Sequence, residues 1–180
     1  MDSRPSKLDQ AIAYVMKSTQ AVHSSSHQFM DQLQSACSNW RLKQPYPAKR
    51  TDESVGEYGE RVAVIYLQRK GFFILEQSYR IKSGEIDIIA VWRKRVVVFV
   101  EVKTWAEQRE NSGGPSDAVD DRKQEKITRT ALTYMKRHRL LESSGRADVI
   151  EVVLGSDPKH PSFRHFENAF EAVGEYQMFS

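Results

Sequence analysis

The chain has 180 residues, of which 39% are hydrophobic and 28% charged, which is typical of one globular domain with an appendage. A single cysteine excludes an internal disulfide and a thiolate-rich zinc site, and a formal net charge of +3 permits a nucleic-acid partner without indicating one. No apolar run has the length of a membrane span or the flanks of a signal peptide, so we expect a cytoplasmic protein with no membrane partner.

Residues 1–48 differ in pattern from the rest of the chain. Their apolar residues recur at helical spacing on both sides of the Ser24–His27 stretch, which predicts two helices. The segment QPYPAKRTDES that follows has two prolines and is typical of a linker. We therefore divide the chain into a helical or partly disordered extension with its linker, residues 1–48, and a folded domain, residues 49–180. A second interpretation, in which the extension docks a partner or a second copy, stays open.

The sequence of the folded domain predicts both helices and strands. A helical pattern is followed by Gly71, a residue typical of a helix C-terminus. Three strand patterns come next, joined by the turns KSG and RKR, and then a polar loop, a long amphipathic helix and another strand. The order α-β-β-β-α-β predicts an α/β fold of mixed central sheet flanked by helices. The expected elements are a helix over 53–70, strands over 72–81, 84–92 and 96–105, a helix over 121–141, a strand over 147–154 and a short terminal element over 162–170.

The hairpin GEIDIIAVWRKRVVVFVEVK separates its residues by face, because side chains alternate along a strand. The even positions are entirely apolar and predict a covered face. The odd positions are apolar near the turn and polar at the open end, where we expect a cleft. The even face comprises Ile86, Ile88, Ala90 and Trp92 opposite Val96, Val98, Val100 and Val102. The odd face comprises Glu85, Asp87, Ile89 and Val91 opposite Val97, Phe99, Glu101, Lys103 and Trp105.

A hairpin centred on Lys94 places Asp87 opposite Glu101 on the odd face. Directly opposed like charges are destabilising, and two half-buried carboxylates need a shared proton or a cation. Lys103 alone cannot serve both carboxylates fully. An all-oxygen ligand set favours Mg²⁺ or Mn²⁺ over zinc.

A third carboxylate comes from the preceding helix. Glu60 shares a helical stripe with Gly56, Ala63, Val64 and Leu67, so we expect it to face the sheet. A carboxylate among small and apolar residues is costly without a partner. Any one of these acids alone is more typical of an edge charge, a cap or half of a salt bridge. The convergence of helix face, strand parity and register is the stronger signal. It places Glu60, Asp87, Glu101 and Lys103 together.

This arrangement resembles the PD-(D/E)xK nuclease core shared by type II restriction enzymes and Holliday junction resolvases. More closely, residues 54–170 resemble the bacterial YraN family, also called UPF0102, of predicted endonuclease-like proteins. The resemblance rests on the stretches GEYGERVAVIYLQRKGFFIL, YRIKSGEIDIIA, VVVFVEVKT, DDRKQEKI, ADVIEVV and HFENAF. It implies a restriction-endonuclease-like core with an N-terminal helical extension added to it.

The resemblance implies Mg²⁺- or Mn²⁺-dependent hydrolysis of phosphodiester bonds, with branched or structured DNA a more fitting substrate than RNA. In that interpretation Asp87, Glu101 and the backbone carbonyl of Val102 hold the metal, and Glu60 completes its shell directly or through water. Lys103 orients the attacking water or stabilises the developing charge. Relatives of this fold that cut junctions pair two sites, which leaves a homodimer open.

Basic residues near this site are candidates for phosphate contacts. For the basic residues of the long helix, an ordinary solvated face is an equally good interpretation, and Arg80 and Lys82, just before the GEID turn, are the closer candidates. The other side of the long helix, with Ile127, Ala131, Tyr134, His138 and Leu141, should pack on the sheet. Two other functional classes stay open: a non-catalytic nucleic-acid-binding module, and an interaction protein acting through residues 1–48. The candidate nucleic-acid contacts are Arg80, Lys82, Arg122, Lys123, Lys126 and Arg129.

Overall fold

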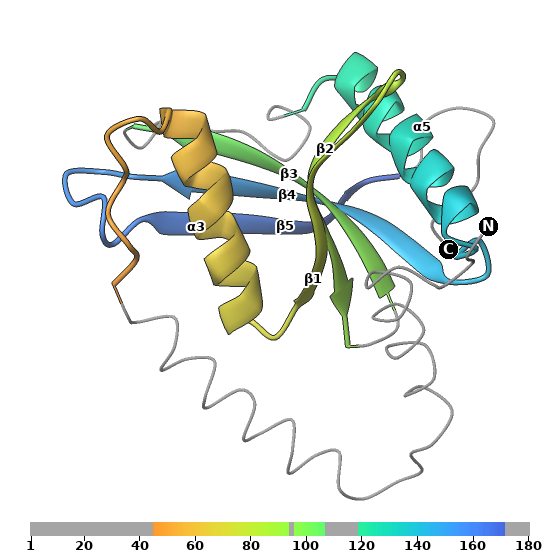
Figure 1. The fold of residues 1–180 in the computed structure, drawn as a ribbon, viewed down its shortest axis with the longest axis horizontal. Coiled ribbons are helices and arrows are strands. Elements are labelled where there is room, and N and C mark those ends of the chain that lie inside the picture. The colour runs from red at the N-terminus through yellow and green to blue at the C-terminus, as the bar shows by residue number, and fades with distance from the viewer. Residues whose placement is uncertain (1–44, 94–95, 107–118, 172–180) are drawn as a thin grey trace, which may run out of the picture.

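The computed structural model describes residues 45–93, 96–106 and 119–171, which form a five-stranded sheet with one helix packed on each face (Figure 1). The predicted α/β class is confirmed, and the terminal element proves to be a fifth strand. Within these residues no helix is both long enough and apolar enough to cross a membrane. The predicted helices of the N-terminal extension, the 107–118 loop and the centre of the RKR turn lie outside the described residues. The elements are α3 (Val55–Arg69), β1 (Phe73–Ile81), β2 (Gly84–Trp92), β3 (Val96–Trp105), α5 (Asp121–Arg137), β4 (Ser144–Val153) and β5 (Ser162–Phe170).

The strands lie in sequence order across the sheet, from β1 at one edge to β5 at the other. Neighbouring strands are antiparallel except β3 and β4, which are parallel. A parallel pair needs a long crossover connection, and α5 lies within it. The sheet is therefore mixed, as predicted.

Helix α3 begins and ends where local side-chain chemistry dictates. The Ser54 hydroxyl accepts a hydrogen bond from the Glu57 backbone N–H, and the Glu57 carboxylate accepts one from the Ser54 N–H, which forms a capping box. Gly71 follows the helix with a φ of 90°, a conformation that favours glycine. The helix thus begins at Val55 rather than at the predicted Glu53.

Two apolar layers cover the two faces of the sheet, largely as the alternation of the hairpin predicts. One layer packs against α3 and the other against α5. Ile86 is an exception, because it lies in the α5 layer and not with Ile88. Its partner on β1, Tyr79, is buried in the same layer. The α3 layer includes Ile88, Ala90, Val98 and Val100, and the α5 layer includes Ile89, Val97, Phe99, Ile127, Ala131 and Tyr134.

Helix α5 is shorter than predicted. It ends at Arg137, and Arg139 follows with a φ of 57°, which continues the chain in a turn. Leu140 is buried as a result, whereas Leu141 is 56% exposed and does not pack on the sheet as expected. The apolar periodicity of the sequence continues past the true end of the helix, so it could not mark this boundary.

The segment before α3 is part of the folded unit, although its two prolines are typical of a linker. Tyr46 is only 5% exposed and packs on Phe163 of β5, with 5.2 Å between the ring centroids. Its backbone N–H donates to the carbonyl of Lys159 at 2.8 Å. The guanidinium of Arg69 lies 4.2 Å from the centre of the Tyr46 ring.

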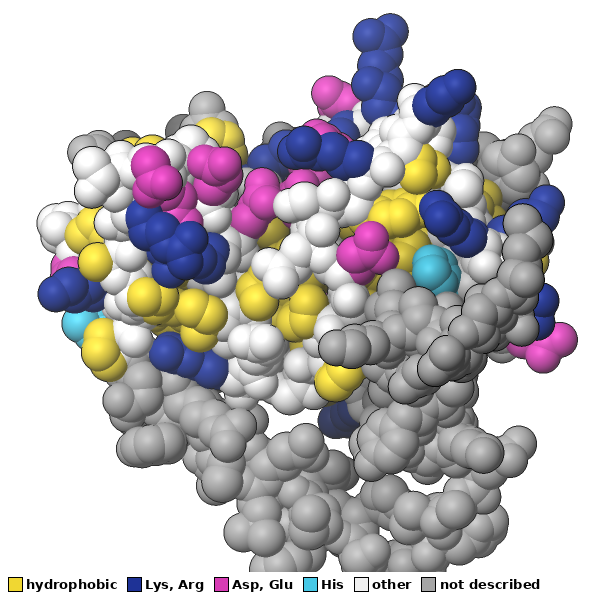
Figure 2. Space-filling model, in the orientation of Figure 1, with side chains coloured by type: hydrophobic (Ala, Val, Ile, Leu, Met, Phe, Trp, Pro, Cys, Tyr) yellow, Lys and Arg dark blue, Asp and Glu magenta, His cyan; other side chains and the backbone are white. Residues whose placement is uncertain are grey.

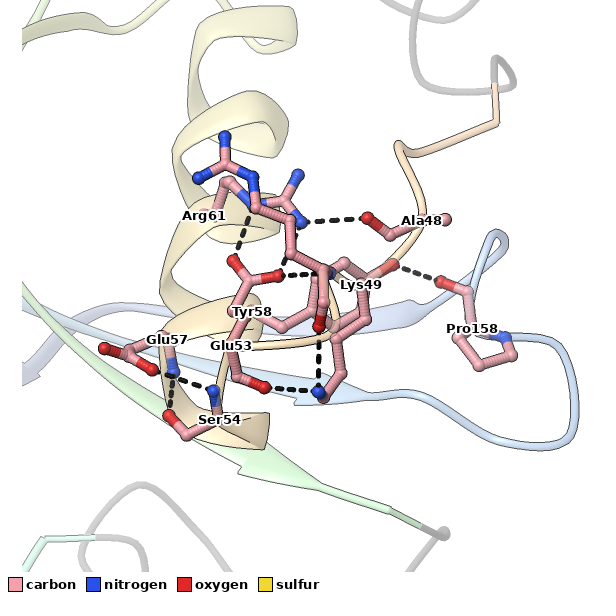
Figure 3. A network of polar contacts seen from close by, with 9 residues as sticks. Ala48, Lys49, Glu53, Ser54, Glu57, Tyr58, Arg61 and Pro158 are labelled. Atoms are coloured by element: carbon pink, nitrogen blue, oxygen red, sulfur yellow. Dashed lines mark hydrogen bonds and ion pairs between the residues drawn. The ribbon is translucent and has the colours of Figure 1, made fainter.

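A polar network fastens the same segment to α3 (Figure 3). Arg61 donates to both carboxylate oxygens of Glu53, each at 2.7 Å, and to the carbonyl of Ala48 at 3.0 Å. The Tyr58 hydroxyl donates to the carbonyl of Pro158, in the connection between β4 and β5, at 2.6 Å. These contacts fix the N-terminal half of α3, which carries Glu60.

Candidate active site

Strands β2 and β3 separate at the open end of the hairpin. Their pairing runs from Trp92–Val96 to Ile88–Val100 and stops there, in the register that a hairpin centred on Lys94 predicts. At the next position the carboxylate of Asp87 takes over the role of the missing strand partner. Its Oδ2 accepts a hydrogen bond from the backbone N–H of Val102 at 2.7 Å.

The same hydrogen bond orients the carbonyl of Val102. The N–H and C=O of one residue in a strand point toward the same neighbouring strand. Because the Val102 N–H faces Asp87, its carbonyl oxygen also faces the gap between β2 and β3. A carboxylate and a carbonyl oxygen therefore approach this gap from opposite strands.

Glu101 is a buried carboxylate held between two lysines. Its side chain is 4% exposed, and the Lys103 ammonium lies 3.0 Å from Oε1. The Lys123 ammonium, from the first turn of α5, lies 3.1 Å from Oε2 and also 3.8 Å from Glu85. The lysines come from different elements, so Glu101 connects β3 with α5.

Glu60 reaches this end of the sheet because α3 lies unusually close to β3. A Cβ atom on Gly59 would stand 1.8 Å from the Thr104 hydroxyl oxygen, so only glycine permits this approach. Glu60 is half-buried at the next position of the helix. The predicted orientation of Glu60 toward the sheet is consistent with this placement.

The three carboxyl groups interact electrostatically. Burial, followed by the charge of Glu101, raises the pKa of Asp87 to about 7; the Val102 hydrogen bond opposes this and the Glu60 charge adds to it. Burial also raises the pKa of Glu60. The charge of Arg80 opposes this rise, and the charges of Glu85 and Glu101 add to it. Burial alone would lower the pKa of Lys123, but the surrounding carboxylates raise it above its ordinary value. Negative charge is thus concentrated at this point of the fold.

A basic groove adjoins the carboxylates. It has a volume of about 360 Å³ and lies between the β1–β2 turn and α5. Gly84 permits the close approach of the turn, because a Cβ there would stand 2.8 Å from the Thr130 hydroxyl oxygen on α5. Along the upper edge of the view in Figure 2, acidic and basic side chains gather between the positions of α3 and α5. The groove is lined by Arg80, Ile81, Lys82, Ser83, Gly84, Glu85, Lys123 and Lys126.

Comparison with known proteins identifies the family of the chain. The model of the family described as "Uncharacterised protein family UPF0102" matches residues 59–152. The chain belongs to this family. A UPF0102 protein of Rhodopirellula baltica is 44% identical over 122 residues, which cover 67% of this chain and 72% of that protein. A UPF0102 protein of Trichlorobacter lovleyi is 41% identical over 121 residues, which cover 67% of this chain and 92% of that protein. A UPF0102 protein of Alkaliphilus metalliredigens is 42% identical over 118 residues, which cover 66% of this chain and 98% of that protein.

The candidate residues of the UPF0102 chain lie within the range that the family model matches. The structure brings the four predicted catalytic residues to one end of the sheet, and four of the six predicted nucleic-acid contacts line the adjoining groove. Arg122 and Arg129 are exposed on α5 and are not among the groove residues, and Arg129 pairs with Glu125 at 2.6 Å.

The donor atoms of this UPF0102 site suit a divalent cation of the magnesium type. Carboxylate and carbonyl oxygens are the ligands that Mg²⁺ and Mn²⁺ prefer. Among the described residues, however, no three His, Cys, Asp or Glu side chains converge closely enough to hold a metal ion as they stand. Instead, a lysine ammonium group lies close to each carboxylate oxygen of Glu101, at 3.0 Å for Lys103 and 3.1 Å for Lys123. The chemistry of the site fits such a cation, and the lysines supply positive charge without it.

A second buried carboxylate in the UPF0102 chain, on β4, has its negative charge neutralised by neighbouring groups of the protein. Asp148 on β4 is fully buried, and the Arg146 guanidinium lies 3.0 Å from its carboxylate. The Asn168 N–H donates to it, and His165 Nε2 lies 2.9 Å away. Each oxygen of Asp148 thus has a protein partner, as expected of a structural ion pair. Glu101 also has a lysine near each oxygen, but its charge acts in addition on a second carboxyl group, that of Asp87, and raises the pKa there.

The sequence assigned Lys123 to phosphate contacts and did not place it at the carboxylates. The structure pairs it with Glu101. The signal that fixes its position is the start of α5, where the Asp120 side chain accepts from the Lys123 backbone N–H at 2.8 Å. That cap is readable in the sequence, but the approach of α5 to Glu101 depends on tertiary packing.

Proposed function

We propose that this protein is a metal-dependent endonuclease that hydrolyses phosphodiester bonds in nucleic acid. The observation that carries the proposal is the meeting of Asp87, Glu101 and Lys103 at the point where β2 and β3 separate, beside a basic groove. Family membership by itself names no activity. The chemistry of these side chains supports the assignment.

Each residue has a role that its position supports. Asp87, Glu101 and the Val102 carbonyl would hold Mg²⁺ or Mn²⁺, with Glu60 completing the set directly or through water. When bound, the ion supplies charge neutralisation and a more acidic water molecule. Lys103, whose ammonium lies 3.0 Å from Glu101, would orient that water or stabilise charge on the phosphate oxygens.

The groove supplies the positive charge that a nucleic-acid backbone requires. Arg80, Lys82, Lys123 and Lys126 line it, and contacts of this kind position a phosphate backbone without reading its sequence. DNA, in branched or otherwise structured form, is the proposed substrate. A homodimer that pairs two such sites stays a prediction.

A cleavage panel tests this proposal. End-labelled branched, single-stranded and duplex DNA, with matching RNA, are incubated with the full-length protein in Mg²⁺, in Mn²⁺ and in EDTA. We expect cleavage of at least one substrate in either metal and none in EDTA. Glu101→Gln removes a carboxylate charge with little change in shape and should abolish that cleavage.

The panel also separates the competing functional classes. If the protein binds the same substrates but cleaves none of them in any metal, it is a non-catalytic nucleic-acid-binding module and not a nuclease. Cleavage that Glu101→Gln retains would show that the nuclease site lies elsewhere. Removal of residues 1–44, which leaves the buried Tyr46 in place, with activity and oligomeric state measured, tests whether the protein acts through that extension.

A further inference from the structure

Lys123 belongs to two sites at once. Its ammonium lies 3.1 Å from Glu101 Oε2, and the same side chain lines the basic groove together with Arg80, Lys82 and Lys126. Lys103 also contacts Glu101 but is not among the residues that line the groove. Lys123 is thus placed between the carboxylates and the proposed path of the phosphate backbone.

The burial of Glu101 explains why a lysine is held there. A carboxylate that is 4% exposed has lost most of its hydration, and an unpaired charge in that position is strongly destabilising. Asp87 adds further negative charge from the neighbouring strand. The cluster needs positive charge whenever no divalent cation is bound, and the lysines provide it.

We propose that Lys123 is a displaceable internal cation that occupies Glu101 in the metal-free protein and moves to a substrate phosphate when a divalent cation binds. The inference rests on the proposed function of this site and adds a coupling between metal and substrate. A divalent cation on Glu101 cancels the attraction that holds the ammonium and repels it. The groove that Lys123 already lines is where an anionic ligand would receive it.

The proposal makes metal binding and phosphate binding cooperative. Before the metal binds, Lys123 is engaged with Glu101 and contributes less to the groove. After the metal binds, its charge becomes available to the phosphate. Each ligand therefore strengthens the binding of the other by the same factor, as linkage requires.

Calorimetric titration with Mn²⁺ alone, at pH 8 and without nucleic acid, tests the displacement. The full-length proteins are the wild type, Lys123→Gln, Lys123→Arg and Lys126→Gln, the last as a matched control because Lys126 lines the same groove on the same helix. Lys123→Gln removes the competing charge and should bind Mn²⁺ about tenfold more tightly than the wild type. Lys123→Arg and Lys126→Gln should stay close to the wild-type affinity.

A second measurement does not depend on the folding of a variant. In the wild-type protein, Mg²⁺ should shift the side-chain ¹³Cε resonance of Lys123 and leave that of Lys126 nearly unchanged. If the wild type binds Mn²⁺ but Lys123→Gln binds it no more tightly, or if the Lys123 resonance does not respond to Mg²⁺, the inference is overturned while the proposed metal site stands. Absence of any metal binding by the wild type overturns the proposed function as well.

Discussion

The carboxylate of Asp87 accepts a hydrogen bond from the Val102 backbone N–H at 2.7 Å, at the first position where β2 and β3 no longer pair. This contact holds the two strands together while it keeps a gap open between them. It also fixes a half-buried carboxyl group near Glu101. The same contact therefore sets the shape of the site and brings negative charge into it.

Asp87 should make the stability of the metal-free protein depend on pH. Its pKa rises from 3.8 to about 7 on folding, so the folded state binds the proton more tightly than the unfolded state. The associated stabilisation is complete below the unfolded pKa and is lost as pH rises through the folded pKa. The free energy of unfolding in EDTA should therefore fall between pH 4 and 7, by at most about 1.4 kcal/mol per pH unit from this group.

Asp87→Asn isolates this effect, because asparagine can still accept the Val102 hydrogen bond but does not ionise. In urea unfolding with EDTA, the variant should be more stable than the wild type at pH 8, and this advantage should shrink toward pH 4. A difference between the two proteins that does not change with pH would contradict the assignment.

The basic groove should govern the salt dependence of nucleic-acid binding. Lys126→Ala and Arg80→Ala should each weaken binding to all sequences and reduce the slope of log K against log salt concentration by about 1, because each removes one phosphate contact. Fluorescence anisotropy with a labelled oligonucleotide measures this. Arg93→Ala, at the opposite end of β2 from the groove, is the control and should leave the slope unchanged.

The close packing of α3 on β3 should show in two glycine substitutions on one helix. Gly59→Ala places a Cβ 1.8 Å from the Thr104 hydroxyl oxygen and should lower the free energy of unfolding by about 1–3 kcal/mol or more. Gly56→Ala meets its nearest atom only at 4.0 Å and should raise stability by about 0.5–1 kcal/mol through helix propensity. Equal effects of the two substitutions in chemical denaturation would contradict the close approach of α3 to β3 at Gly59.

The Glu53–Arg61 pair should stabilise the docked N-terminal segment above acidic pH. Hydrogen bonds from Arg61 hold the pKa of Glu53 at about 2, below its ordinary value of 4.5. Its contribution is therefore present above pH 4.5 and is lost as pH falls toward 2. Glu53→Gln should cost about 1 kcal/mol at pH 7 and progressively less toward pH 2. Thermal unfolding of both proteins across this range measures it, and a cost that does not change with pH would contradict the prediction.

Local rules were enough to predict much of this fold and of its site. The alternation of the hairpin and its register around Lys94 place Asp87 and Glu101 at adjacent ends of two strands, because one face must be buried. The helical pattern over residues 53–70 and the glycine at position 71 locate α3 to within a turn. These features depend on neighbours in sequence or directly across a turn.

Features that depend on distant partners could not be predicted in the same way. Tyr46 is buried because Phe163 and Arg69 surround it, and neither is near it in sequence. Lys123 meets Glu101 only because α5 returns over the sheet. Ile86 packs in the layer of α5 together with Tyr79, its partner on β1, and the alternation within β2 alone does not predict this.

The central claim is that the carboxylates between β2 and β3 support hydrolysis of phosphodiester bonds. The most direct measurement is the initial rate of Mg²⁺-dependent cleavage, on the best substrate of the panel, by the wild type, Asp87→Asn and Lys103→Ala. Glu76→Gln, which neutralises a carboxylate on neighbouring β1, is the control. We predict a loss of at least about 10²-fold in both site variants, with wild-type circular dichroism and an unchanged rate in the control. Cleavage by either site variant at the wild-type rate would contradict the account.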